Sequence, residues 1–249
     1  MENQEYYKMY QQENEFWWYK ILHNIVKQFI LKSFPKGDLK IFDAGCGTGR
    51  MIEVLQPFGD VSGLDFSTEA VSFSKERGLK NIYQGDINTW EFKENSYDVI
   101  ISLDVLYHES IIDEKIILKR MYNGLKDNGI LILNLPAFNH LKREHDICVQ
   151  TKKRFTRKPT NKTLKQLNFK ILKSTYRIPL LYFVILALKL KRKIVKPKTT
   201  QSDLNMIAKP INGFFTFLGA LENKYISKIG SLPLGSSLFI VAKKMSDDV

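Results

Sequence analysis

Three glycines at alternate positions stand where a predicted strand gives way to a predicted helix. Gly45, Gly47 and Gly49 follow an apolar run that ends at Asp43, and a helical pattern begins at Met51. Glycine permits a left-handed backbone and lets a ligand approach the main chain closely. The first turn of the next helix adds unpaired N–H groups and the positive end of the helix dipole. The spacing therefore predicts a turn that cradles an anionic group.

The spacing also narrows the kind of ligand. The turn reads G-x-G-x-G, whereas the dinucleotide pattern is G-x-G-x-x-G, and the G-K-[ST] ending of a phosphate-binding loop is absent. Asp65 stands 20 positions after Gly45, at the end of the second predicted strand. A carboxylate there can accept hydrogen bonds from two ribose hydroxyls. A ribose without a pyrophosphate cradle indicates a nucleoside rather than a dinucleotide.

Strands and helices alternate around this turn. We predict strands over 39–43, 61–64, 81–84, 97–103, 129–135, 169–176 and 237–242. We predict helices over 16–34, 51–56, 67–77, 111–125 and 160–167. The pattern predicts an α/β, Rossmann-like fold, in which seven mostly parallel strands have helices on both faces.

Several sets of residues carry a family resemblance. Asp43-Ala44-Gly45-Cys46-Gly47-Thr48-Gly49 resembles motif I of the class I S-adenosylmethionine-dependent methyltransferases. Gly85-Asp86-Ile87 and Tyr97-Asp98-Val99-Ile100 resemble further parts of that pattern at consistent spacing. The resemblance spans residues 16–135 most clearly, and it implies that the cofactor is S-adenosylmethionine.

The resemblance also assigns the cofactor's contacts by position. Asp43 and the glycines would face the methionine part, Asp65 would take the ribose hydroxyls, and Phe66 would pack on the adenine. Asp86 would meet the adenine amino group, and Leu103 would line the methyl-transfer side. The full predicted set is Asp43, Gly45, Cys46, Gly47, Gly49, Asp65, Phe66, Asp86, Ile87 and Leu103. Two cysteines cannot form a cysteine-based metal site, and no metal ligand is predicted.

The chain divides into three predicted regions. Residues 1–38 would form an N-terminal helix that lids the cofactor pocket, as such helices do in the resembled family. Residues 39–177 and 237–245 would form the methyltransferase core. Residues 178–236 would form a helical insertion that faces the acceptor or a membrane. The insertion contains two apolar segments, 178–190 and 211–221, joined by a basic, proline-containing linker over 191–210.

Two histidines are candidates for the base that removes a proton from the acceptor. Methyl transfer to oxygen or nitrogen requires alignment and the loss of one proton. His108 ends the segment Asp-Val-Leu-Tyr-His, which resembles the family's Asp-Val-Leu-Glu-His. His145 precedes Asp146 after the fifth strand and resembles a subgroup with a His-Asp pair there. For His108, capping or positioning the next helix is an equal alternative.

The net charge of +12 is unevenly distributed. Residues 1–139 carry −5 and the remainder +17, with 18 basic and two acidic residues between 142 and 198. This basic stretch borders the apolar segment 178–190, a pattern that suits the surface of an anionic bilayer. Phosphate binding by the same stretch would suit RNA, but the fourth strand lacks the Asn/Asp-Pro-Pro-aromatic motif of base amino methyltransferases.

These observations predict an enzyme that methylates an oxygen or nitrogen of a small-molecule or lipid-linked acceptor. An RNA-directed methyltransferase that uses residues 142–198 is the first alternative, and a non-catalytic cofactor-binding protein is the second. We expect a cytoplasmic location, with peripheral attachment to the inner face of the membrane as a further possibility. The sequence leaves the oligomeric state open.

Overall fold

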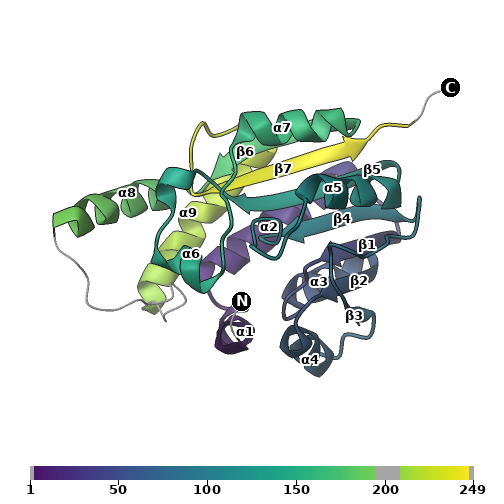
Figure 1. Ribbon diagram of the computed structural model, residues 1–249, viewed down its shortest axis with the longest axis horizontal. Helices are drawn as coiled ribbons and strands as arrows, with labels where there is room; N and C mark the ends of the chain where they lie inside the picture. The colour runs from purple at the N-terminus through teal and green to yellow at the C-terminus, as the bar shows by residue number, and fades with distance from the viewer. Residues whose placement is uncertain (1–2, 195–207, 247–249) are drawn as a thin grey trace.

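The computed structural model describes residues 3–194 and 208–246, with side chains for 5–143, 146–189 and 208–246. Seven strands form one sheet in the order β3-β2-β1-β4-β5-β7-β6 (Figure 1). The strands are β1 (Leu39–Ala44), β2 (Gly59–Asp65), β3 (Ile82–Gln84), β4 (Tyr97–Leu103), β5 (Leu125–Pro136), β6 (Phe169–Arg177) and β7 (Ser237–Lys244). β1 to β5 pair in parallel, whereas β7 runs antiparallel between β5 and β6. The predicted seven-stranded, mostly parallel sheet is confirmed.

Helices cover both faces of this sheet. α5 (Glu114–Gly124) and α7 (Arg157–Gln166) bury their apolar side chains against one face. α2 (Trp17–Ser33), α3 (Arg50–Leu55), α4 (Thr68–Glu76) and α9 (Lys209–Lys228) pack on the other. The central strands are apolar on both sides because each side faces a helical layer. The order reverses between β1 and β4, which places the switch point of the sheet at their carboxyl ends.

Some element boundaries differ from the predicted ones. α5 begins at Glu114 rather than at residue 111, because the Asp113 carboxylate caps it by accepting from Lys115 N–H at 2.8 Å. α1 (Asn3–Gln12), α6 (Glu144–Cys148) and two short 3-10 turns, η1 (Gln56–Phe58) and η2 (Asn139–Leu141), were not predicted.

The insertion is helical, as predicted. α8 (Pro179–Ile194) follows β6, and α9 precedes β7. α8 extends into the predicted linker as far as Ile194, and the middle of that linker lies outside the described residues. Among the helices that the structure describes, none has the length and apolar character to cross a bilayer.

Candidate functional site

The glycine turn after β1 adopts a backbone that other residues resist. Gly45 has φ 95° and Gly47 φ 54°, both in the left-handed region. The N–H groups of Gly45 and Cys46 both donate to the Leu64 carbonyl, at 2.8 and 2.9 Å, which anchors the turn to β2. A Cβ on Gly45 would lie 2.2 Å from Val105 Cγ2. Both sterics and conformation therefore require glycine there.

Asp65 ties this turn to the end of β2. Its Oδ2 accepts from Gly47 N–H at 2.8 Å, and its Oδ1 accepts from Ser67 N–H at 3.0 Å. The Tyr6 hydroxyl also hydrogen bonds to it. Burial raises the pKa of Asp65, and these hydrogen bonds oppose the rise because they stabilise the carboxylate. The carboxylate is thus fixed beside the glycine turn, with one of its roughly four lone-pair sites left for a ligand.

Asp43 lies deeper, at the end of β1. Its side chain is buried, and its Oδ1 has no hydrogen-bond partner among the described residues. Burial raises its pKa to about 8, and the nearby Asp65 charge contributes in the same direction. A buried carboxyl group without a partner is costly unless a ligand satisfies it. A cationic group placed next to the turn would do so.

A cavity of about 630 Å³ runs along the carboxyl ends of the central strands. It brings together ten of the predicted site residues: Asp43, Gly45, Cys46, Gly47, Asp65, Phe66, Asp86, Ile87, Leu103 and His108. Gly49 lies behind the turn at the N-cap of α3, with Ser74 and Leu79 against it. The side chain of His145 lies outside the described part of the structure, so its role stays a prediction.

The unpredicted helix α1 lies against the glycine turn. Its Tyr6 and Met9 line the cavity, as does Glu13 just beyond its end. Glu13 is buried, accepts from the Thr48 hydroxyl and pairs with the Arg77 guanidinium. Burial raises the pKa of Glu13 to about 7 despite these partners. The three- and four-residue spacing of these side chains is the sequence signal that could have revealed the helix.

The other end of the cavity is polar and built from β4 and the segment after β5. Asp104 has a left-handed φ of 54° and accepts from Asn134 Nδ2 at 2.7 Å. Burial raises its pKa to about 7. Asp146 receives two hydrogen bonds from Arg154, at 2.7 and 3.0 Å, and this pair is almost completely buried.

His108 lies in a tight turn at this end. Ser110 N–H donates to its Nδ1 at 3.1 Å, and Gln150 also hydrogen bonds to the ring. Burial lowers its pKa, which favours the neutral imidazole. Asp113 rather than His108 caps the following helix. Of the two alternative roles for His108, capping the following helix is thus taken by Asp113, and positioning that helix stays a prediction.

Comparisons with known proteins identify the family to which this chain belongs. Residues 35–184 match the model of a family described as methyltransferase domain. The chain belongs to this family. Its fold is that of S-adenosylmethionine-dependent methyltransferases, and S-adenosylmethionine is the cofactor that the family implies.

Relatives in the methyltransferase family differ in what they are named for. Phosphoethanolamine N-methyltransferase 1 of Triticum aestivum is 31% identical over 115 residues, covering 43% of this chain and 23% of that protein. Malonyl-[acyl-carrier protein] O-methyltransferase of Bacillus anthracis is 27% identical over 148 residues, covering 53% and 54%. The matched part of the chain thus spans about half or less of the length of these relatives.

Solved structures share the methyltransferase fold at low identity. Phosphoethanolamine N-methyltransferase 2 of Haemonchus contortus superposes with a TM-score of 0.59 at 18% identity, covering 89% of this chain and 53% of that one. A methyltransferase of Archaeoglobus fulgidus gives 0.57 at 16%, covering 89% and 94%. These likenesses show the fold.

The glycine turn fits S-adenosylmethionine, the cofactor that the family implies. A glycine cradle that a Cβ would fill and an unpartnered buried carboxyl oxygen at Asp43 match a ligand with an amino group. Burial and the charges of Asp43 and Asp65 raise the pKa of the Cys46 thiol well above its ordinary value, which disfavours the thiolate that a nucleophile requires. Asp104 and the α1 residues Tyr6 and Met9 are the site residues that sequence reasoning missed.

Proposed function

We propose that this chain transfers a methyl group from S-adenosylmethionine to an oxygen or nitrogen of a small-molecule or lipid-linked acceptor. The observation that carries the proposal is a cavity that joins the glycine turn, Asp43 and Asp65 to His108 and the Asp146–Arg154 pair. The bound cofactor supplies an activated methyl group. The protein then has to align the acceptor and accept one proton.

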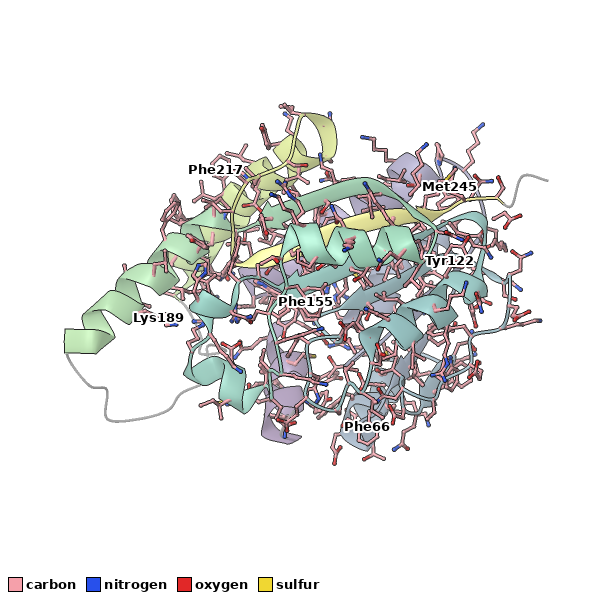
Figure 2. The ribbon with its side chains drawn as sticks, turned by 45° about the horizontal axis from the view of Figure 1, so that its top comes forward. Phe66, Tyr122, Phe155, Lys189, Phe217 and Met245 are labelled. Atoms are coloured by element: carbon pink, nitrogen blue, oxygen red, sulfur yellow. The ribbon has the colours of Figure 1, made fainter. Side chains whose placement is uncertain are left out.

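On the cofactor side, Asp65 would take the ribose hydroxyls through its remaining lone-pair site and the one that the Tyr6 hydroxyl occupies. Asp43 would pair with the amino group. Phe66 is 74% exposed at the rim, so its ring is accessible to the adenine (Figure 2). Asp86, Ile87 and Leu103 line the same stretch of the cavity. Gly49 would support the turn from behind rather than touch the cofactor.

On the acceptor side, His108 and His145 remain the proposed bases, and Asp104 joins them. Asp104 lines the cavity, and its pKa of about 7 lies in the range where a general base is most effective. The family's relatives carry names for both oxygen and nitrogen acceptors, which supports leaving the methylated atom open. We expect His108→Ala, His145→Ala or Asp104→Asn to lower the rate while cofactor binding persists.

Incubation with methyl-labelled cofactor and a cell extract tests the proposal. We expect production of S-adenosylhomocysteine and a labelled product, both lost in Asp65→Ala. Cofactor binding without any product in extracts would contradict the proposal and favour a non-catalytic cofactor-binding protein. Full activity in all three base variants would remove those residues as bases.

An RNA acceptor is the second candidate. A relative named tRNA U34 carboxymethyltransferase, from Sulfurovum sp., is 27% identical over 151 residues. Several cations of residues 142–198 are engaged within the chain, however: Lys153 with Glu114, Arg154 with Asp146, and Lys152 with the Ile111 carbonyl. Because these cations are already paired within the chain, they are less available to RNA phosphates. Their pairing therefore favours the small-molecule or lipid-linked acceptor. A salt-sensitive gel shift with RNA would favour the alternative.

The predicted cytoplasmic location, with attachment at the inner face of the membrane, belongs to the same proposal. Fractionation of cells that express the tagged protein would test it. Recovery outside the cytoplasmic and membrane fractions would contradict it.

A further inference from the structure

The helices of the insertion carry large apolar side chains on their outer surface. Nine of the nineteen large apolar side chains that are exposed among the described residues stand on α8 and α9. They are Leu180, Phe183, Val184, Leu188, Ile211, Phe214, Phe217, Leu221 and Tyr225, each 39–61% exposed. Such a concentration, unlike scattered apolar residues, marks an interaction surface. We refer to these nine residues as the insertion face.

On α9 the spacing separates an inner and an outer side. Gly219 and Asn223 pack on α2: a Cβ on Gly219 would lie 2.4 Å from Ile21 Cγ2, and Asn223 Nδ2 donates to the Ile21 carbonyl at 2.7 Å. Phe217 and Leu221 recur at helical spacing on the side away from these contacts, and both are exposed. The inner contacts hold α9 in place and leave its outer face exposed.

One side of α8 lines the cavity, and another side is exposed on the surface of the protein. Leu181 and Ile185, four residues apart, line the large cavity. Leu180, Val184 and Leu188 follow a second row at the same spacing and are 40–46% exposed. α8 projects beyond the sheet at the end where β6 finishes (Figure 1). The helix that forms part of the cavity wall therefore also belongs to the insertion face.

An apolar groove of about 360 Å³ continues this face between α8 and α9. Leu180 lies on its α8 side, and Phe215, Leu218 and Leu221 lie on its α9 side. The acid at the groove, Glu222, accepts from Ile178 N–H with both carboxylate oxygens at 3.0 Å. It is therefore turned inward and leaves the groove's surface apolar.

Basic side chains border the insertion face. Lys224 and Lys228 are exposed on α9, three and seven residues after Leu221, so they continue its outer side. Residues 178–236 contain nine basic and two acidic residues. Figure 2 shows Phe217 on α9 and Lys189 on α8 at the end of the molecule opposite Met245. Apolar side chains bordered by lysines complement the acyl boundary and phosphate layer of an anionic bilayer.

We propose that the insertion face docks the chain on the surface of an anionic lipid bilayer. The apolar side chains reach the acyl boundary, and Lys224 and Lys228 meet lipid phosphates. Because Leu181 and Ile185 join α8 to the cavity, docking also brings the cavity to the membrane. Docking assigns residues to the membrane attachment that the proposed function includes, and entry of a lipid-borne acceptor along α8 rests on the proposed methyl transfer.

Vesicle flotation with the full chain tests the docking. We expect binding to vesicles of phosphatidylcholine with phosphatidylglycerol, weak binding to phosphatidylcholine alone, and loss of binding between about 0.1 and about 0.5 M salt. Lys224→Glu with Lys228→Glu should weaken binding at least about 30-fold, because each lysine near such a surface contributes about fivefold. Phe214→Ser with Phe217→Ser should weaken it at least about tenfold.

Ile116→Ser is the matched control, because Ile116 is 51% exposed on α5, on the opposite face of the sheet. It should bind vesicles as the parent does. Equal binding by the parent and the phenylalanine variant would overturn the proposal. So would a dimer in light scattering that the phenylalanine variant abolishes, since the face would then be covered by a second copy. Each variant is also titrated with S-adenosylhomocysteine, which it should bind as the parent does. Failure of docking with normal S-adenosylhomocysteine binding then concerns the insertion face and not the proposed function.

Discussion

Two buried acids at neighbouring strand ends have different surroundings and so serve different groups. Asp65 accepts hydrogen bonds from the turn and from Ser67, which keep its charge favourable at a site suited to neutral hydroxyls. Asp43 has an oxygen without a partner among the described residues, which a cationic ligand group would satisfy, and without such a group burial raises its pKa to about 8. The difference between them is local hydrogen bonding, since both are buried.

We expect Asp65→Ala to weaken S-adenosylmethionine binding by about 100-fold or more. Two hydrogen bonds to a charged acceptor are lost, each contributing about 1.5–3 kcal/mol. Isothermal titration calorimetry measures the change. Asp60→Ala, which removes an exposed acid near the start of the same strand, is the control and should bind as the parent does. Unchanged affinity in Asp65→Ala would show that the ribose site is placed wrongly.

The raised pKa of Asp43 predicts a pH dependence of stability. Between the unfolded pKa of about 4 and the folded pKa of about 8, the folded protein keeps a proton that the unfolded chain has lost. The free energy of unfolding of the cofactor-free protein should therefore fall as the pH rises through this window. Asp43→Asn should remove roughly 3–5 kcal/mol of that fall.

Urea unfolding at about pH 5 and at about pH 8, near the two ends of this window, measures the dependence. Asp127→Asn, at a 57% exposed acid, is the control and should keep the parental slope. A parental slope in Asp43→Asn would contradict the assignment. The raised pKa values of Glu13 and Asp104, about 7 each, also make the free energy of unfolding fall as the pH rises. They do so in the parent and in both variants alike, so the comparison isolates Asp43.

At the scale of elements, the glycine turn depends on two constraints that can be separated. Gly45 and Gly78 both have a left-handed φ, but a Cβ on Gly78 would meet nothing within 4 Å. Gly78→Ala should thus cost only the conformational term of about 1–2 kcal/mol. Gly45→Ala adds the clash with Val105 and should destabilise the protein further and weaken cofactor binding at least about tenfold.

Thermal and urea unfolding with cofactor titration compare these variants. Adding Val105→Ala to Gly45→Ala should recover part of the lost stability, because it removes the methyl groups that the new Cβ meets. Equal effects of Gly45→Ala and Gly78→Ala would show that the contact with Val105 carries no energy.

At the scale of the whole molecule, a buried polar chain links the insertion to the acceptor end of the cavity. Arg177 is fully buried; it lies 3.9 Å from Glu222 of α9 and donates to Asn134 at 3.4 Å. Asn134 in turn donates to Asp104 in the cavity. Burial lowers the pKa of Arg177 to about 10, and the acids at both ends oppose that shift. The chain holds α9, β6, β5 and β4 in a fixed arrangement.

Glu222→Ala should destabilise the protein by about 3–5 kcal/mol, because it leaves the buried Arg177 charge poorly compensated. Urea unfolding measures the loss. Glu91→Ala, which removes an exposed pair with Arg120, is the control and should leave the free energy of unfolding unchanged. Arg177→Met with Glu222→Leu should recover part of the loss, because it removes the uncompensated charge but leaves the Ile178 N–H without its acceptor. No recovery at all would contradict the role of the pair.

The sequence by itself determined the parts of this protein that local pattern controls. Alternating apolar runs predicted the seven strands, and the glycine spacing predicted the ligand turn with Asp65. The family resemblance supplied the other predicted residues that the structure brings to the cavity. The strand and turn predictions succeed because strands, turns and the carboxyl edge of a parallel sheet follow from short-range periodicity and a fixed topology.

Only the tertiary structure decided the rest. The place of β7 between β5 and β6, the packing of α1 on the glycine turn, and the pKa of Asp104 depend on residues far apart in the chain. The cations of the basic half could likewise be divided into engaged and exposed ones only once their partners were placed. Burial and partner distance are properties of the folded chain, and no local spacing encodes them.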